Sequence, residues 1–218
     1  MKLNTAIASA LLAASVQANA TLIIDNSTTG LYNAGLGDLA NMDGPGGFLL
    51  GQNVSEGDPS IELAADPGFS FTTEFGADWL AGDYTGGSWS APGTAIPTTW
   101  AVNTETAIVH DFVLGSLSDM TIDVGVDNGI VLWLDGIFLF GATRSGGANL
   151  NEYDINLAAI SAGNHSLQIL RTDHGGSTGY AIEVRAEAVH VSEPATLGLL
   201  GLGLAGLLAT TRRRKPAA

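Results

Sequence analysis

The sequence predicts an all-β fold, an antiparallel β-sandwich, for the exported part of the chain. Short runs rich in β-branched and aromatic residues recur and are separated by Gly, Asn, Asp and Pro, which is typical of strands and turns. Helical periodicity is hard to find between residues 21 and 191, which argues against a parallel sheet with crossover helices. The two ends of the chain have a different, more apolar composition.

The N-terminus has the pattern of a cleaved export signal. Lys2 supplies a positive charge, residues 6–16 form a small apolar segment, and an A-x-A site runs from Ala18 to Ala20. We expect the first 20 residues to be a signal peptide, so that the mature chain begins at Thr21.

Residues 21–191 then form one exported domain, and its composition excludes several functions. Cysteine is absent, which rules out thiol catalysis and cysteine-ligated zinc. The span holds 21 acidic side chains and three arginines, a net charge of −18. Nucleic acid is not an expected partner, because phosphate binding needs Lys and Arg. The acidity favours a soluble secreted domain, with specific calcium sites as the alternative.

The expected strands are short and follow one another through this domain. They are residues 22–25, 47–51, 60–63, 69–75, 99–103, 107–114, 120–126, 130–134, 137–141, 153–156, 166–171 and 180–190.

The clearest local pattern lies between residues 120 and 141. Asn128-Gly129 and Asp135-Gly136 each separate two apolar runs, and both dipeptides favour the positive φ of a two-residue hairpin. A three-strand meander is predicted. Its middle strand, residues 130–134, is apolar on both faces and should lie centrally.

Three turns follow in order after residue 126. Asp127-Asn128-Gly129 precedes a strand, an Asp-Gly hairpin comes next, and an Ala-Gly-Asn turn at residues 162–164 leads into a long strand. This pattern resembles galactose-binding-like jelly-roll domains. The resemblance implies a jelly-roll form of the sandwich and no particular function.

Residues 77–100 are loop-rich and hold three of the four tryptophans. In one interpretation, their rings pin a long loop onto the sandwich. In the other, they stack on the apolar faces of sugars, while Asp78 and Asp83 accept hydrogen bonds from hydroxyl groups. The rings of this sugar platform would be Trp79, Tyr84, Trp89 and Trp100.

The sequence predicts no catalytic residue. Residues 175–179 spell G-x-S-x-G, but a strand-like run follows where a nucleophile elbow needs a helix. No spacing picks out a carboxylate pair for glycoside hydrolysis, which leaves a hydrolase as the least favoured alternative. The expected cofactor is none, or calcium shared by Asp123, Asp127 and Asn128. In the alternative to calcium, these residues form an exposed strand face and a turn.

The C-terminal segment, residues 192–218, has three parts in a fixed order. Ser192, Glu193 and Pro194 form a polar turn, and an apolar run follows at about 195–211. As a helix this run is about 22 Å long in its strictly apolar part, and we expect it to span a membrane with snorkelling from its end. The basic cluster that follows, which is expected to stay in the cytoplasm, is Arg212, Arg213, Arg214 and Lys215.

This three-part tail resembles the PEP-CTERM sorting signal of bacterial envelope proteins, although Ser192 replaces the usual Pro. The resemblance implies recognition by exosortase, a membrane protease, and export to the envelope, surface or extracellular matrix. A plain single-span anchor is the alternative. We therefore expect a non-catalytic interaction or structural protein of the surface or exopolysaccharide matrix. A carbohydrate-binding module that uses the 77–100 loop to bind polysaccharide is the second hypothesis.

Overall fold

The computed structural model describes residues 19–39, 61–68, 72–76, 78–144, 146–173 and 175–189. The chain divides into one unit at Met1–Ala188 and a second at Val189–Ala218. The predicted signal peptide up to residue 18, the sorting motif, the apolar run and the basic cluster all lie outside the described residues. Within the ranges given above, no helix has the length and apolar character needed to cross a membrane.

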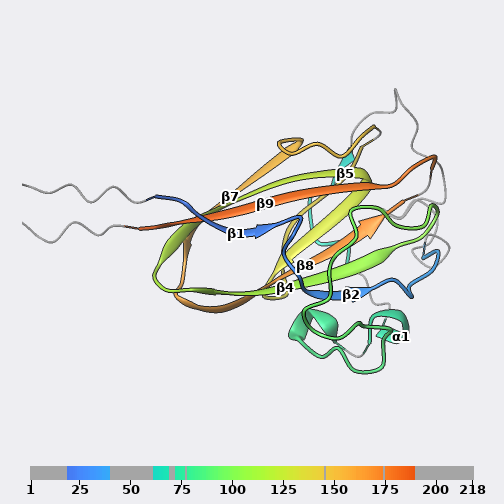
Figure 1. The fold of residues 1–218 in the computed structure, drawn as a ribbon, viewed down its shortest axis with the longest axis horizontal. Helices are drawn as coiled ribbons and strands as arrows, with labels where there is room; N and C mark the ends of the chain where they lie inside the picture. Colours follow the sequence, from blue (N-terminus) through green and yellow to red (C-terminus); the bar gives the residue numbers. More distant parts are fainter. Residues whose placement is uncertain are drawn as a thin grey trace, which may run out of the picture. The chain divides into compact units, whose positions relative to one another are not determined.

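The prediction of an all-β domain is confirmed for the described residues (Figure 1). The only helices among them are the short α1 (Thr72–Phe75) and the 3-10 helix η1 (Trp79–Ala81). The strands are β1 (Thr21–Asp25), β2 (Leu31–Asn33), β3 (Ile61–Glu62), β4 (Thr106–Leu114), β5 (Ser118–Leu134), β6 (Ile137–Arg144), β7 (Tyr153–Ile160), β8 (Gly163–Thr172) and β9 (Gly179–Ala188).

The strands form two layers that share β5 (Figure 1). Its first part, residues 118–127, pairs with β9 and in part with β7, and β1 extends this first sheet beyond β9. Its second part, residues 128–134, lies between β6 and β8. In this second sheet, β4 and then β2 follow β8, and β3 borders β6. All of these pairings are antiparallel.

The predicted hairpin at Asn128-Gly129 is wrong, because β5 runs through this dipeptide without turning. Asn128 pairs with Arg144, and Gly129 pairs with both Thr143 and Thr172. Pairing partners on neighbouring strands therefore override the local preference for a turn. The hairpin at Asp135-Gly136 is correct, with positive φ values of 52° and 76° at its two residues.

Two further predicted strands are wrong, and one predicted segment cannot be compared. Residues 99–103 form a loop. The indole N–H of Trp100 donates to the carbonyl of Thr104 at 2.9 Å, and the backbone N–H of Trp100 donates to the hydroxyl of Thr178 at 2.9 Å. The Thr178 hydroxyl, which also donates to the carbonyl of Trp100, thus satisfies backbone groups that a strand would pair. Helix α1 occupies the described part of residues 69–75. Residues 47–51 lie outside the described residues.

The second half of β5 is covered on both faces, as predicted. Ile130 and Leu132 belong to the core between the two sheets. Val131 and Trp133, which alternate with them, belong to a second core beneath the 72–100 segment. All four side chains are buried, so this strand separates two hydrophobic clusters.

A buried arginine fastens the loop before β4 to the sandwich. The guanidinium carbon of Arg171 lies 4.3 Å from the ring centre of Trp100, 4.9 Å from that of Tyr180 and 5.6 Å from that of Tyr32. Its Nη1 also donates to the carbonyl of Pro97 at 2.7 Å. Burial lowers its pKa to about 10, so the side chain remains charged at neutral pH. The charge is stabilised by ring faces and a carbonyl oxygen.

We predict that Gly125→Ala destabilises the domain by about 2–3 kcal/mol, because a side chain here overpacks a site closed by backbone. A Cβ at Gly125 would lie 2.0 Å from the carbonyl oxygen of Asn149. Urea unfolding measures the change. Gly115→Ala is the matched control, since a Cβ there meets no atom within 4 Å. Equal midpoints for the two variants would contradict the prediction.

Candidate ligand-binding site

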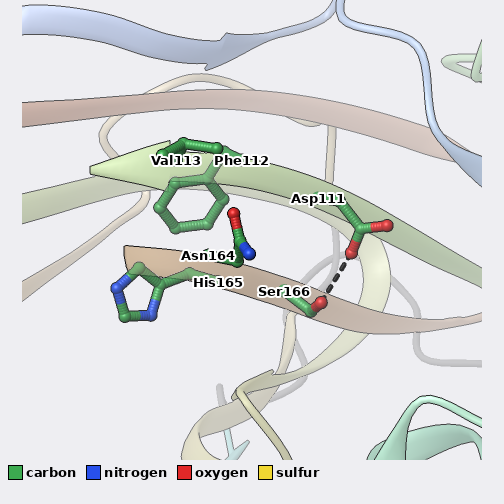
Figure 2. Close-up of a pocket in the computed structure, with 6 residues that line it drawn as sticks. All are labelled: Asp111, Phe112, Val113, Asn164, His165 and Ser166. Atoms are coloured by element: carbon green, nitrogen blue, oxygen red, sulfur yellow. Dashed lines mark hydrogen bonds between the residues drawn. The ribbon is translucent and has the colours of Figure 1, made fainter. Parts of the chain in front are cut away.

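A hollow opens where β4 and β8 run side by side near one end of the second sheet (Figure 2). The register places Asp111 opposite Ser166, Phe112 opposite His165 and Val113 opposite Asn164. These six residues line the hollow, which has a volume of about 380 Å³. The site is therefore built from two short stretches, 111–113 and 164–166, that are far apart in sequence.

The polar part of the hollow is suited to hydroxyl groups. The hydroxyl of Ser166 donates to Oδ1 of Asp111 at 2.5 Å (Figure 2). The side chain of Asn164 is exposed and offers both a donor and an acceptor. Tyr84 reaches the same place from the 77–100 loop. Burial and the charge of Asp111 raise the pKa of its phenol, and a hydrogen bond with Ser166 acts in the opposite direction.

The imidazole of His165 forms the inner wall and is bound at both nitrogens. Nδ1 lies 2.7 Å from Oδ2 of Asp135, and Nε2 lies 2.9 Å from the carbonyl oxygen of Ser161. Both partners are acceptors, so both nitrogens donate only in the protonated ring. Burial acts to lower the pKa of His165, but the bonds to Asp135 and Ser161 outweigh it, and the pKa is raised. The ring of Phe112 lies 5.6 Å from this imidazole.

The β5–β6 hairpin and the aromatic loop hold this wall in place. Oδ1 of Asp135 accepts the backbone N–H of Ser166 at 2.8 Å. The buried amide of Gln168 accepts the N–H of Gly136 at 2.8 Å and donates to the carbonyl of Leu80 at 2.8 Å. Hairpin, loop and β8 are therefore connected through one buried side chain.

The arrangement supports binding better than catalysis. The Ser166 hydroxyl donates to the Asp111 carboxylate, and His110 bonds elsewhere, to the carbonyl of Thr29. His165 is occupied at both nitrogens. The hollow presents a carboxylate, an amide, a hydroxyl and aromatic rings, which together can bind hydroxyl groups and apolar ring faces.

Three of the four rings of the predicted sugar platform are brought together, since Trp89 lies 5.3 Å from Tyr84 and 5.8 Å from Trp79, and the fourth, Trp100, lies apart. Trp79 is buried, stacks on Phe75 at 4.8 Å, and meets the edge of Trp133 at 5.6 Å. Trp89 packs 5.8 Å from Trp79 and donates its indole N–H to the carbonyl of Phe75.

Trp100 lies apart on Arg171, and of the four rings Tyr84 is the one that reaches the hollow. The predicted acceptor Asp83 binds the backbone and hydroxyl of Thr85, at 3.0 and 2.6 Å. These bonds lower its pKa. The rings thus mainly have the packing role that was the alternative.

The predicted calcium ligands lie in one strand but have separate surroundings. Asp123 and Asp127 are about 13 Å apart along β5 at 3.3 Å per residue. Asp123 lies in register with Asp154 and Glu183, and its pKa is raised by burial and then by Asp154.

The carboxylate of Asp127 is buried and accepts hydrogen bonds from Ser177 at 2.8 Å and from the side chain of Asn128 at 2.9 Å. Burial raises its pKa. In the described part of the chain, no three or more His, Cys, Asp or Glu side chains form a group that could hold a metal. Calcium at Asp123, Asp127 and Asn128 stays a prediction.

The sequence did not single out the residues of the hollow. Its only hint was His165, one of four scattered histidines, and nothing linked it to Asp135 or to Asp111. Strand register creates these contacts, since Asp111 and Ser166 are 55 positions apart. These contacts could have been predicted only from the register in which β4 pairs with β8.

Comparison with known families identifies the tail. The model of the PEP-CTERM protein-sorting motif matches residues 190–215, which confirms the predicted sorting signal. The protein is therefore one that is exported and sorted at the membrane. No curated protein matches the chain.

Solved structures match the chain at low identity. An anti-sigma factor domain-containing protein is 12% identical with a TM-score of 0.35, and the match covers 77% of this chain and 44% of that one. The PA14 sugar-binding domain from an RTX adhesin is 18% identical, with a TM-score of 0.33 and 82% of each chain covered. The PA14 domain of the antifreeze protein MpAFP is 16% identical, with a TM-score of 0.32 and coverage of 83% and 90%. This chain thus spans less than half of the first of these proteins.

We predict that His165 stabilises the fold below neutral pH and that this contribution is lost on the alkaline side. The folded state raises its pKa, so its contribution is complete below the unfolded pKa of about 6.5 and disappears as pH rises through the folded pKa. Urea unfolding across pH should show a flatter alkaline decline for His165→Gln than for the unaltered protein. Parallel profiles above about pH 6.5 would contradict this assignment.

The neighbouring His110 provides a control of opposite sign. Burial lowers the pKa of His110 to about 4. Between this pH and the unfolded pKa of about 6.5, the imidazole is protonated in the unfolded chain and neutral in the folded state. Stability should fall by about 3 kcal/mol as pH drops from about 6.5 towards 4, and His110→Gln should remove that part of the acid slope.

Proposed function

We propose that this protein is an exported surface component whose β-sandwich domain binds a hydroxyl-rich polymer of the cell surface or exopolysaccharide matrix, without catalysing a reaction on it. The hollow between β4 and β8 carries the binding part of this proposal. It combines the exposed amide of Asn164, the Asp111–Ser166 pair and the aromatic residue Tyr84. Vicinal hydroxyls need such paired donors and acceptors, and sugar C–H faces need a ring.

The sorting motif supports the location. A PEP-CTERM tail implies an exosortase-type protease as partner, a membrane-inserted precursor, and either an anchored or a released product. An acidic domain without disulfides, with 21 carboxylates against three arginines, suits a soluble role outside the membrane. Neither an enzymatic cofactor nor a nucleic acid belongs to this function.

We predict that the protein isolated from its native host lacks residues beyond the sorting motif, so that its intact mass corresponds to a chain beginning near Thr21 and ending close to Pro194. The variant Glu193→Ala/Pro194→Ala should retain the tail and fractionate with the membrane. A wild-type mass that includes Arg212–Lys215 would show a permanent anchor instead of processing.

Binding is tested by depleting the full chain from solution with insoluble polysaccharides. Asn164→Ala and Ser166→Ala should each weaken retention about twofold to tenfold, the range expected for loss of one hydrogen bond. Melting temperatures should stay close to the unaltered value, since surface substitutions change stability by less than about 0.5 kcal/mol.

Asn156→Ala on β7 is the matched control, because it removes an exposed asparagine from the other sheet. If the polysaccharide retains the Asn164→Ala and Asn156→Ala variants equally well, the binding site is not the hollow between β4 and β8. If no polysaccharide retains the unaltered protein, the binding part of the proposal is wrong and a purely structural role remains.

A further inference from the structure

The charge around the hollow is negative and is not compensated by the arginines of the domain. Arg171 is buried beneath three rings. Arg185 donates to Glu183 at 2.6 Å on the first sheet. Arg144 lies at the far end of β6, opposite Asn128. None of the three pairs with the carboxylate in the hollow.

Asp111 is an exposed carboxylate whose hydrogen-bond donor is neutral. The Ser166 hydroxyl binds Oδ1 at 2.5 Å without supplying positive charge. The nearby imidazole of His165 is bound to Asp135 at 2.7 Å. His110, one residue earlier in β4, is uncharged at neutral pH because burial lowers its pKa to about 4. Among the described residues, Asp111 has no cationic partner.

One aromatic residue lies on the same face of the sheet as this carboxylate. Phe112, the next residue in the strand, points to the opposite face, where it packs against the core between the sheets and lies 5.6 Å from His165. Tyr84 is close enough for the charge of Asp111 to raise the pKa of its phenol, which keeps it neutral. Aromatic faces attract ammonium groups, as carboxylates do. Val113 adds an exposed apolar surface, with a relative accessibility of 67% for the residue.

We propose that the hollow binds an amino sugar, with its protonated amine against Asp111 and its neighbouring hydroxyls against Asn164 and Ser166. This deepens the proposed function and rests on it: the polymer bound at the surface is one that carries free amines. The domain's net charge of −18 attracts such a polymer and repels polyuronates. An N-acetylated polymer keeps the hydroxyls and loses the charge.

The test compares three polymers of known charge with the full chain at about pH 5.5, where amines are protonated and aspartates remain ionised. They are polyglucosamine, its N-acetylated form and polygalacturonate. We expect retention in that order. Asp111→Asn keeps the shape of the side chain and should lower the affinity for polyglucosamine about threefold to fivefold, the range for one exposed ion pair. Its affinity for the acetylated polymer should be unchanged.

Glu187→Gln on β9 is the control, because it removes the same charge from an exposed position on the first sheet. If both variants lose affinity equally, the attraction comes from the overall field and the site is refuted. Equal or stronger binding of the acetylated polymer, or an unaffected Asp111→Asn, overturns the amino-sugar assignment and leaves polysaccharide binding intact. Retention by none of the three polymers overturns the proposed function as well.

Discussion

The architecture depends on a single strand that belongs to two sheets. Residues 118–127 of β5 pair with β9 and β7, and residues 128–134 pair with β6 and β8. A strand can belong to both layers only if its residues leave room for the segments that pack closely against its backbone. Glycines meet this need, since a Cβ at Gly125 would lie 2.0 Å from the Asn149 carbonyl and one at Gly129 would lie 2.1 Å from the Thr172 hydroxyl.

The position of the hollow follows from this shared strand. The second half of β5 aligns β8, β8 aligns β4, and their register brings Asp111 to Ser166. The hairpin that ends β5 supplies Asp135, which binds His165 and the backbone of Ser166. The aromatic loop then covers the outer face of this sheet and presents Tyr84 beside it. Contacts among four segments therefore fix one small polar surface.

The acidic composition has different effects at different carboxylates. Asp135 is used inside the fold, where it binds the His165 imidazole at 2.7 Å. Asp111 points into the hollow and is held only by a hydroxyl. Arg171, one of the three arginines between residues 21 and 191, is packed under aromatic rings. The same residue type thus stabilises the fold at Asp135 and, in the function we propose, binds the ligand at Asp111.

The sequence by itself determined the β class, the Asp135-Gly136 hairpin, the doubly covered strand at 130–134 and the sorting tail. These features depend on residues that are close together in the chain, such as turn dipeptides, alternation and an ordered terminal signal. Only the tertiary structure decided that β5 passes through Asn128-Gly129, that Trp79 is a core residue, and that Asp111, Ser166 and His165 share one site. Long-range register decides these features, because it chooses each residue's neighbours, and a single sequence does not encode that choice in any local pattern.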